Sequence, residues 1–288
     1  MINRKNQRKS LVLLAIAAIV AIEFSGCGKD CYECQVFTTE ELSITDKITG
    51  IIIDGPWDVT ITQEDTDNSA VLDYCVSEKS KVSARLLSNG YLHIRVSTRR
   101  NVHHNDFRAT IQAASLKKIE ASGAASIRTY GHFCSLENIS LSGASAVNGL
   151  SGEGFFAKIK LSGASTLKDF SFDGNSINAD ISGASNANFD NLNLEYCKVD
   201  CSGASVFAVR KAYVPECLFI GSGASSFKTR NLESENLVIH LSGASTAEVT
   251  VNNTITGSLT GASMLKYRKA VNVSGVSTSG ASKISRLD

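Results

Sequence analysis

The stretch KIKLSGASTL, residues 158–167, decides the fold, because close copies of it recur at a fixed distance along the chain. The Ser-Gly-Ala core begins at seven positions that are each twenty residues apart, and copies at Thr260 and Ser279 continue the series with spacings of 18 and 19. The seven positions are Ser122, Ser142, Ser162, Ser182, Ser202, Ser222 and Ser242. A fixed period this short predicts a solenoid, in which each coil packs on its neighbours.

The residues before each serine alternate between apolar and polar types. In the quoted copy, Ile159 and Leu161 are apolar, whereas Lys158 and Lys160 are polar. This alternation is typical of a strand with one buried face. Twenty residues leave no room for a crossover helix between copies, so successive strands must stack in parallel. The chain is therefore predicted to be all-β, a single-stranded parallel β-helix with coils of twenty residues.

A glycine occupies each predicted corner of the coil, because glycine accepts a positive φ. These glycines are Gly55, Gly123, Gly143, Gly163, Gly183, Gly203, Gly223, Gly243, Gly261 and Gly280. We expect the neighbouring alanine to fit a narrow interior and the flanking hydroxyls to form hydrogen-bond ladders between coils. A Gly-x-Ser sequence also suggests a nucleophilic serine. Nine copies favour a structural role, since catalysis needs one activated serine with a base beside it.

A degenerate copy precedes the clear ones. Residues 51–59 align with residues 139–147 at the apolar positions and at Gly55, so the β-helix is predicted to begin near residue 48. Gly123 follows Gly55 by 68 positions, which is too long for one coil. We expect the intervening segment to add antiparallel strands that extend the first coils and cap the N-terminal end. The predicted strands are 71–76, 81–86 and 91–97, with a hairpin turn at 88–90.

The first residues have the pattern of an export signal. Four basic residues precede an apolar run, 11–22, that is too short to span a bilayer, and Phe-Ser-Gly then leads to Cys27. This pattern predicts a lipoprotein in which Cys27 becomes the acylated first residue and anchors the protein to a membrane. The alternative is an ordinary signal peptide with an incidental cysteine. The predicted organisation is a leader at 1–26, an anchor and tether at 27–47, first coils with inserted hairpin strands at 48–120, and regular repeats at 121–288.

The charge balance gives no sign of a nucleic-acid partner. The whole chain has a formal net charge of +1. Removal of the leader, which holds four basic residues and one acidic residue, leaves the mature chain at −2. A nucleic-acid-binding protein would instead carry a basic excess.

Three features together resemble a known family. These are residues 51–61, the turn and strand at 89–94, and the serial Ser-Gly-Ala-Ser copies. They resemble the exported Bacteroidetes proteins described as the putative auto-transporter adhesin head domain, or GIN domain, over roughly residues 45–288. The resemblance implies a right-handed β-helix on a surface-exposed lipoprotein and brings no catalytic residues. Residues 28–30 are also similar to the short charged signal that directs Bacteroides lipoproteins to the cell surface, so we expect an outer-membrane lipoprotein of the cell envelope.

The chain has eight cysteines, of which Cys27 is assigned to lipid. Cys197 and Cys217 are twenty residues apart in an inward column. Adjacent strands lie about 4.8 Å apart, which falls within the Cα separation that a disulfide allows. Two buried thiols are the favoured alternative. Cys31 and Cys34 have redox-like spacing but no strand–helix context, so a tether disulfide or unpaired thiols are favoured over a redox or zinc site.

Asp180 and Asp200 are the strongest candidates for chemistry, because they share an outward column in neighbouring coils. Carboxylates about 5 Å apart match the spacing in a retaining glycosidase, or could hold a cation. The alternative is a solvated pair, whose repulsion in water is only about 1 kcal/mol. His103 and His104 lie in a polar, basic stretch. We interpret this stretch first as a solvated loop and only second as a metal or anion site. No cofactor is expected.

The sequence therefore favours a non-enzymatic cell-envelope lipoprotein. Its β-helical rod would act as an adhesin or as a surface that binds a glycan or a protein. One alternative is a carbohydrate-active enzyme, a polysaccharide hydrolase or lyase, that uses the face near Asp180 and Asp200. Another is a purely structural envelope protein. The oligomeric state is not predicted.

Overall fold

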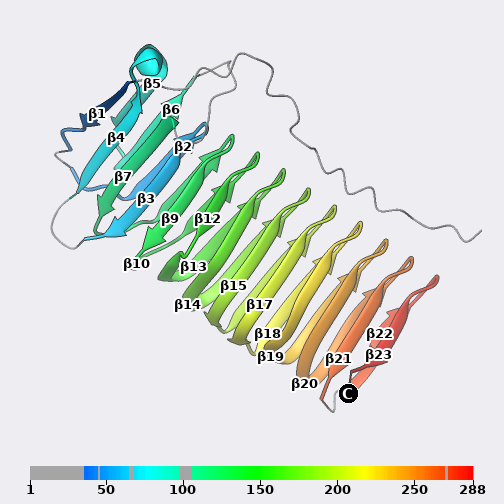
Figure 1. Ribbon diagram of the computed structural model, residues 1–288. Coiled ribbons are helices and arrows are strands. Elements are labelled where there is room, and N and C mark those ends of the chain that lie inside the picture. The colour runs from blue at the N-terminus through cyan, green and yellow to red at the C-terminus, as the bar shows by residue number, and fades with distance from the viewer. Residues whose placement is uncertain (1–35, 45, 65–67, 98–105, 270–271, 288) are drawn as a thin grey trace, which may run out of the picture. The chain divides into compact units, whose positions relative to one another are not determined.

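The computed structural model is almost entirely β-structure, and its strands follow one another as stacked coils (Figure 1). The described residues are 36–44, 46–64, 68–97, 106–269 and 272–287. Each strand of the repeat region pairs in parallel with the strand at the same place in the next coil. Ile159, for example, lies opposite Ala179, which in turn lies opposite Val199. The predicted parallel β-helix is thus confirmed.

Each coil has one strand before the Ser-Gly-Ala corner and one strand after it, which we call face 1 and face 2. Between one corner and the next the chain bends back, and strands β14 (Thr166–Ile181), β19 (Ser226–Leu241) and β20 (Thr246–Leu259) continue through this bend, so they belong to both faces. In spatial order, face 1 contains β6 (Tyr91–Val96), β2 (Gly50–Asp54), β8 (Lys118–Ser122), β11 (Asn138–Leu141), β13 (Ser151–Leu161), β14 (Thr166–Ile181), β16 (Tyr196–Cys201), β18 (Glu216–Gly221), β19 (Ser226–Leu241), β20 (Thr246–Leu259) and β22 (Asn272–Thr278).

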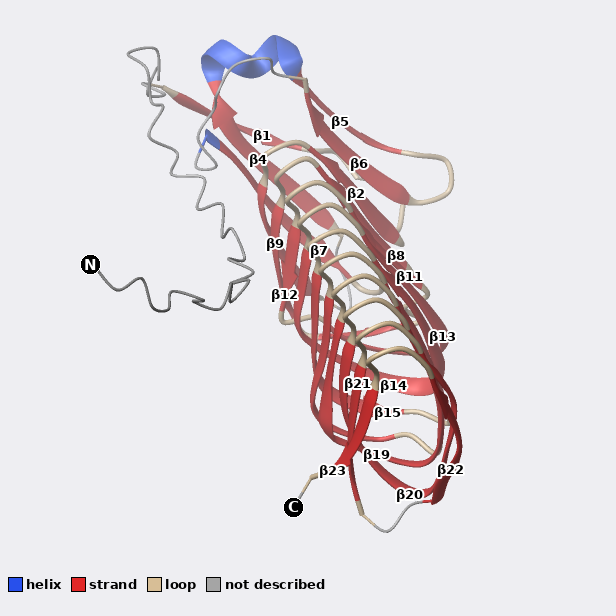
Figure 2. Cartoon of the chain, turned by 90° about the vertical axis from the view of Figure 1, so that its right-hand side faces the viewer, coloured by secondary structure: helices blue, strands red, loops and turns tan. Residues whose placement is uncertain are grey.

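Face 2 is built in the same way, and the corner loops between the faces follow one another along one edge of the stack (Figure 2). Its strands are β7 (Phe107–Ala113), β3 (Asp58–Gln63), β9 (Ser126–Tyr130), β12 (Ala146–Asn148), β14, β15 (Asn186–Asn193), β17 (Val206–Tyr213), β19, β20, β21 (Met264–Arg268) and β23 (Lys283–Arg286). A short strand at the bend, β10 (His132–Cys134), pairs with the start of β13.

The N-terminal coils do not stack in chain order. Strand β2 pairs with both β6 and β8, and β3 pairs with both β7 and β9. The coil formed by β6 and β7 therefore lies outside the coil formed by β2 and β3, although it comes later in the sequence.

Antiparallel strands cover this N-terminal end, as predicted. They are β5 (Val82–Leu86) on β6, β4 (Ser69–Cys75) on β7, and β1 (Phe37–Glu41) on β4. The 3-10 helix η1 (Val76–Lys81) connects β4 to β5, and Gly90 turns the β5–β6 hairpin with a φ of 79°. Among the residues that the structure describes, no helix has the length and apolarity needed to cross a bilayer.

The interior is filled by the predicted inward columns. Ile159 and Leu161 are fully buried, whereas Lys160 between them is exposed. In the middle coils, phenylalanine rings stack along the interior, with the centroids of interacting rings 5.0 to 6.4 Å apart. These rings belong to Phe170, Phe189, Phe207, Phe219 and Phe227. The strand alternation predicted from the sequence is therefore present with its buried side facing the core.

Glycine is required at the corners for two reasons, as Gly183 illustrates. Its φ is +73°, a value that residues with a side chain rarely adopt. A Cβ atom at Gly183 would also lie 2.4 Å from the carbonyl oxygen of Gly163 in the preceding coil. That carbonyl accepts a hydrogen bond from the amide of Ala184 at 2.8 Å, so successive corners are stacked backbone on backbone.

The expectation that the corner alanine faces the interior is wrong. Ala164 and Ala184 are exposed, and it is the following serine of each motif that is buried. The reason is that the inside of the corner carries backbone carbonyls that need donors. Ser245, for instance, donates to the carbonyl of Ser242 at 2.7 Å, which an alanine side chain could not do. The predicted hydroxyl ladder is present along this column, with Ser225 donating to Ser245 at 3.1 Å.

Several predictions concern residues outside the described ranges. These are the leader at 1–26, acylation of Cys27, the pairing of Cys31 and Cys34, and the role of His103 and His104. They stay predictions.

Candidate functional site

The structure brings the predicted acid pair together. Asp180 on β14 and Asp200 on β16 lie directly opposite each other in the parallel register, and both are half-buried. Burial and the neighbouring Asp180 charge raise the pKa of Asp200, and the nearby Lys198 opposes this shift. Within the described ranges, no group of three or more His, Cys, Asp or Glu side chains could hold a metal ion. The pair is thus a two-carboxylate arrangement on an open strand face.

Cys197 on β16 and Cys217 on β18 also lie opposite each other, as their spacing predicts. Both are buried, and the structure has them as free thiols and not as a disulfide. Burial raises the pKa of Cys217 to about 12 and that of Cys197 well above its usual value. Protonated thiols of this kind act as small apolar side chains in the core. Cys75 on β4 is disulfide-bonded.

A serine, an aspartate and a histidine meet at the first corner, but in the wrong order for catalysis. The Asp54 carboxylate accepts a hydrogen bond from Ser122 Oγ at 2.6 Å and contacts His93 Nε2 at 2.8 Å. A catalytic triad needs the imidazole between the hydroxyl and the carboxylate. Burial acts to raise the pKa of Asp54, but the hydrogen bonds from Ser122 and His93 outweigh it and lower the pKa. The network connects β2, β6 and β8.

An open hollow of about 720 Å³ lies on face 1 of the N-terminal coils, and we call it the aromatic hollow. Strands β6, β8, β11 and β13 supply its walls. Its lining includes Tyr91, Lys118, Asn138, Phe155, Phe156 and Lys158. A hollow of this volume is large enough to hold a small organic ligand or a short segment of a polymer.

Gly50 determines how Tyr91 lies in the aromatic hollow. In the register, Gly50 lies between Tyr91 and Lys118, and a Cβ atom there would lie only 2.8 Å from the tyrosine ring. The missing side chain lets the ring lie across the middle strand. The Lys118 ammonium is 5.5 Å from the ring centroid, which is a cation–π contact.

Phe155 and Phe156 form the opposite wall and are 80% and 41% exposed. Two consecutive outward residues break the strand alternation. They follow Gly154, where a Cβ atom would lie 2.7 Å from the carbonyl of Leu136 in the preceding coil. The pairing offset also changes here, because Cys134 lies opposite Glu153 while Asn138 lies opposite Lys158. The bend is therefore displaced, and both rings project from it.

The charges of the aromatic hollow are mostly balanced. Lys118 pairs with Glu120 at 2.5 Å, and Lys117 pairs with Glu137 at 3.5 Å. Within the described residues, Lys158 makes no ion pair. The hollow thus combines flat apolar rings with an ammonium and an amide, Asn138, that can donate hydrogen bonds. This combination suits a ligand with both apolar faces and hydroxyl groups.

The aromatic hollow was not predicted from the sequence, although one signal for it exists. At the position of Phe155, the next coils carry Asn175, Glu195 and Pro215, so a phenylalanine departs from a column without other aromatic residues. An alignment of the repeats by this outward column would have found it. The role of Tyr91 could not have been found this way, because β6 is a late segment that stacks outside β2.

The fold is similar to that of solved structures. One is "a putative adhesin from Parabacteroides merdae ATCC 43184", with a TM-score of 0.65, 13% identity, and coverage of 88% of this chain and 96% of that chain. A second is "putative adhesin from Parabacteroides distasonis ATCC 8503", with a TM-score of 0.61, 15% identity, and coverage of 88% and 97%. A third, from the same organism, is described as "Putative lipid binding protein", with a TM-score of 0.59, 14% identity, and coverage of 88% and 97%.

At these identities, the structural likeness establishes the fold and not the ligand. No curated protein matched the chain. The family comparison is more direct, because it covers most of the repeat region. Residues 47–270 match the model of the family described as "Putative auto-transporter adhesin, head GIN domain", and the chain belongs to that family.

Proposed function

We propose that the protein is a non-enzymatic, adhesin-like binding module of the cell envelope, which engages a glycan through the aromatic hollow. Membership of the adhesin head family supports the binding role and the cell-envelope location. The sequence pattern around Cys27 supports attachment through a lipid anchor, with the coils presented outside the membrane.

The exposure of Phe155 carries the proposal. An exposed phenylalanine side chain forgoes about 1.5–3 kcal/mol that burial would contribute. Phe155 is 80% exposed beside a second exposed ring, Phe156, and across from Tyr91. Clusters of exposed apolar rings with polar neighbours mark sites that a partner covers. A sugar fits this site because its C–H face packs on a ring while its hydroxyls accept hydrogen bonds from Lys158 and Asn138.

The proposal can be tested by binding of the purified protein to a glycan array, followed by titration calorimetry with the glycans that bind. Phe155→Ala should weaken binding roughly tenfold or more, because ring contacts of this kind dominate binding energies. Tyr213→Ala is the matched control. Tyr213 is also an exposed ring, 50% exposed, but it lies on β17, outside the aromatic hollow.

Loss of binding in Phe155→Ala with normal binding in Tyr213→Ala would support the site. Equal binding by both variants and by the unchanged protein would rule out the aromatic hollow as the glycan site. No binding to any glycan would contradict the proposed ligand class. Adhesion of cells that display the full chain, compared with cells that display the Cys27→Ala variant, tests the anchor separately.

A polysaccharide-degrading enzyme is the second candidate, and one observation favours it. Asp200 has a raised pKa beside a second carboxylate, Asp180, and a raised pKa is what a general acid needs. Turnover of polysaccharides by the purified protein would establish this activity. Turnover that Asp180→Asn and Asp200→Asn leave unchanged would remove this pair as its source.

A further inference from the structure

A second hollow lies at the bend where the twenty-residue period fails. The coil that begins at Ser242 is 18 residues long, and the register changes at two nearby places, between Thr229 and Glu233 and between Ser234 and Asn236. Thr229 lies opposite Val249, but the next paired residues are Glu233 and Thr250. Residues 230–232 of β19 therefore have no counterpart on β20 and form a bulge.

The bulge keeps one side chain inside and sends two outward. Leu232 is buried in the core, whereas Arg230 and Asn231 are exposed. Because β20 is shorter here, the surface beside the bulge is recessed to form a hollow of about 980 Å³, which we call the basic hollow. Its cationic lining consists of Arg210, Lys211, Arg230, Arg268, Lys269 and Arg286.

Among the described residues, the basic hollow has more positive charge than its carboxylates neutralise. Arg210 Nη2 pairs with Asp190 at 2.6 Å, and Lys269 Nζ pairs with Glu233 at 2.8 Å. Within the described residues, Lys211, Arg230 and Arg286 make no ion pair. Like charges that converge on one site repel one another unless an anion joins them.

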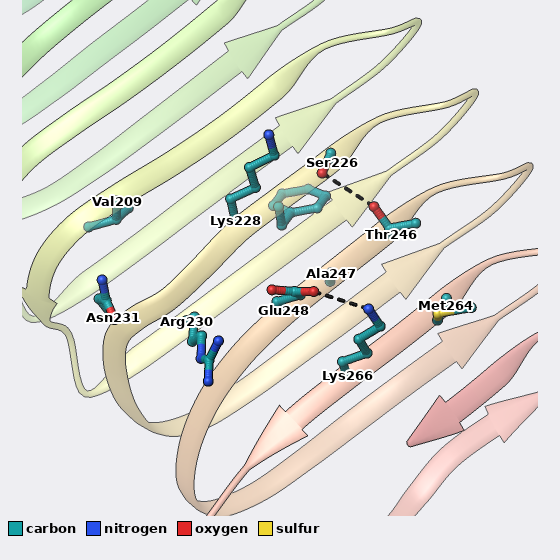
Figure 3. Close-up of a pocket in the computed structure, with 11 residues that line it drawn as sticks. Val209, Ser226, Lys228, Arg230, Asn231, Thr246, Ala247, Glu248, Met264 and Lys266 are labelled. Carbon is teal, nitrogen blue, oxygen red and sulfur yellow. Dashed lines mark hydrogen bonds and ion pairs between the residues drawn. The ribbon is translucent and has the colours of Figure 1, made fainter. Parts of the chain in front are cut away.

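A smaller hollow of about 280 Å³ adjoins the basic hollow and shares Arg230 and Asn231 with it (Figure 3). It adds Lys228, which makes no ion pair in the described part of the chain, and Lys266, which pairs with Glu248 at 3.2 Å. The positive surface thus continues from the bend along face 2. Its arginines come from β17, β19, β21 and β23, and β20, which lies between β19 and β21, contributes Thr250. The positive charges therefore follow the direction in which the coils stack, with one strand without a cation among them.

We propose that the basic hollow binds an acidic polysaccharide, through the carboxylate or sulfate groups of successive sugar residues. Neighbouring strands are about 4.8 Å apart, which is close to the length of one sugar residue in a linear polysaccharide. Guanidinium groups bind such oxyanions through two parallel hydrogen bonds. A lipid surface fits less well, because Leu287 is the one apolar side chain among the described residues that line the basic hollow.

The test uses the purified protein and four probes: immobilised heparin, immobilised polygalacturonate, neutral dextran, and vesicles that contain phosphatidylglycerol. We expect retention on at least one acidic polymer, release by added salt, and no retention on dextran. Arg230→Gln and Arg286→Gln should each weaken retention several-fold, and the double variant roughly tenfold or more. Arg85→Gln is the matched control, since Arg85 is an exposed arginine on β5 with no ion pair in the described residues.

The outcomes separate this proposal from its rivals. Equal losses in Arg230→Gln and Arg85→Gln would mean unspecific attraction and would overturn it. Binding to vesicles alone would replace the polysaccharide with a lipid surface, and no retention on either acidic polymer would also overturn it. Unchanged unfolding temperatures of the variants exclude misfolding. Phe155→Ala should retain its affinity for the acidic polymer, so failure of the aromatic hollow and failure of the basic hollow are distinguishable.

Discussion

The middle coils, residues 151–241, differ from the coils on either side of them in how strictly they keep the period. In the middle coils, corners, inward columns and most paired residues are offset by twenty, and aromatic rings stack through the interior. Inside this region the offset is 19 where Phe170 lies opposite Phe189, and at its two boundaries the offset changes to 19 between Cys134 and Glu153 and to 17 between Glu233 and Thr250. The aromatic hollow and the basic hollow lie at these two changes.

This difference indicates a division of roles within one fold. A constant offset lets every side chain meet its equivalent in the next coil, which closes the core and stabilises the stack. A change of offset forces a bulge or a displaced bend, and side chains there project from the surface. The exact repeats therefore stabilise the fold, and the departures from them form the two hollows at which we propose binding.

Thiol reactivity should show the largest contrast between the two regions. Cys197, Cys201 and Cys217 are buried in the middle coils, whereas the Cys134 thiol is exposed in the flanking region. Burial raises the pKa of Cys201 to about 12 from an ordinary value of 9.0, which lowers its thiolate fraction at pH 8 about a thousandfold. Peptide mapping after treatment of the folded protein with iodoacetamide should find Cys134 modified and the other three protected. Modification of Cys201 as fast as that of Cys134 would show that the middle coils are open.

Substitution of a stacked corner glycine should cost the most stability. Gly183→Ala combines a positive φ with a contact 2.4 Å from the Gly163 carbonyl, so we expect a loss of about 3 kcal/mol in the free energy of unfolding. Gly149→Ala is the matched control from the flanking region. Gly149 also has a positive φ, but its nearest contact would be 3.1 Å away, so about 1–2 kcal/mol is expected. Denaturant unfolding measures both, and equal losses would disprove the role of corner stacking.

The buried serine column should contribute less per residue. Ser225 is buried and donates to Ser245 at 3.1 Å, so Ser225→Ala should lower the free energy of unfolding by about 1 kcal/mol. Ser282 makes a similar corner bond, to the Ser279 carbonyl at 2.9 Å, but in a half-exposed position. Ser282→Ala should lower stability by less than about 0.5 kcal/mol. Thermal unfolding compares the two, and the reverse ranking would contradict the importance of burial along this column.

Neutralisation of Asp180 should have the smallest effect. Burial and the Asp180 charge raise the pKa of Asp200, so the contribution of Asp200 to stability is full at low pH and is lost as pH rises through its raised pKa. Asp180→Asn should lower the pKa of Asp200 toward its ordinary value and stabilise the protein at neutral pH by less than about 0.5 kcal/mol. An NMR titration of the Asp200 carboxyl group measures the shift. Lys198→Gln should move this pKa in the opposite direction, and a shift of the same sign in both variants would contradict the assignment.

The fold was predictable because the Ser-Gly-Ala period and the alternation around Ile159 and Leu161 leave one way to stack the strands. The direction of the corner side chains was not predictable from residue type. Apolarity suggested that Ala184 lies inside, but the carbonyls within the corner need the hydroxyl of the following serine. The acid pair followed from spacing alone. The two hollows did not follow from spacing. The aromatic hollow lies at a local change of pairing between coils that are both twenty residues long, and the position of the loss at Thr250 is visible only in the register.

The position of the β2–β3 coil, between two segments that follow it in the chain, has a consequence for assembly. A solenoid built in chain order can add each new coil to a finished edge as the polypeptide emerges. Here the β2–β3 coil is covered at both edges by segments that are synthesised later. Residues 91–113 must fold back onto one edge, and residues 118–130 pair with the other. Such long-range pairing is slow to form. Residues 50–63 are thus covered on both sides only after the chain has continued to residue 130.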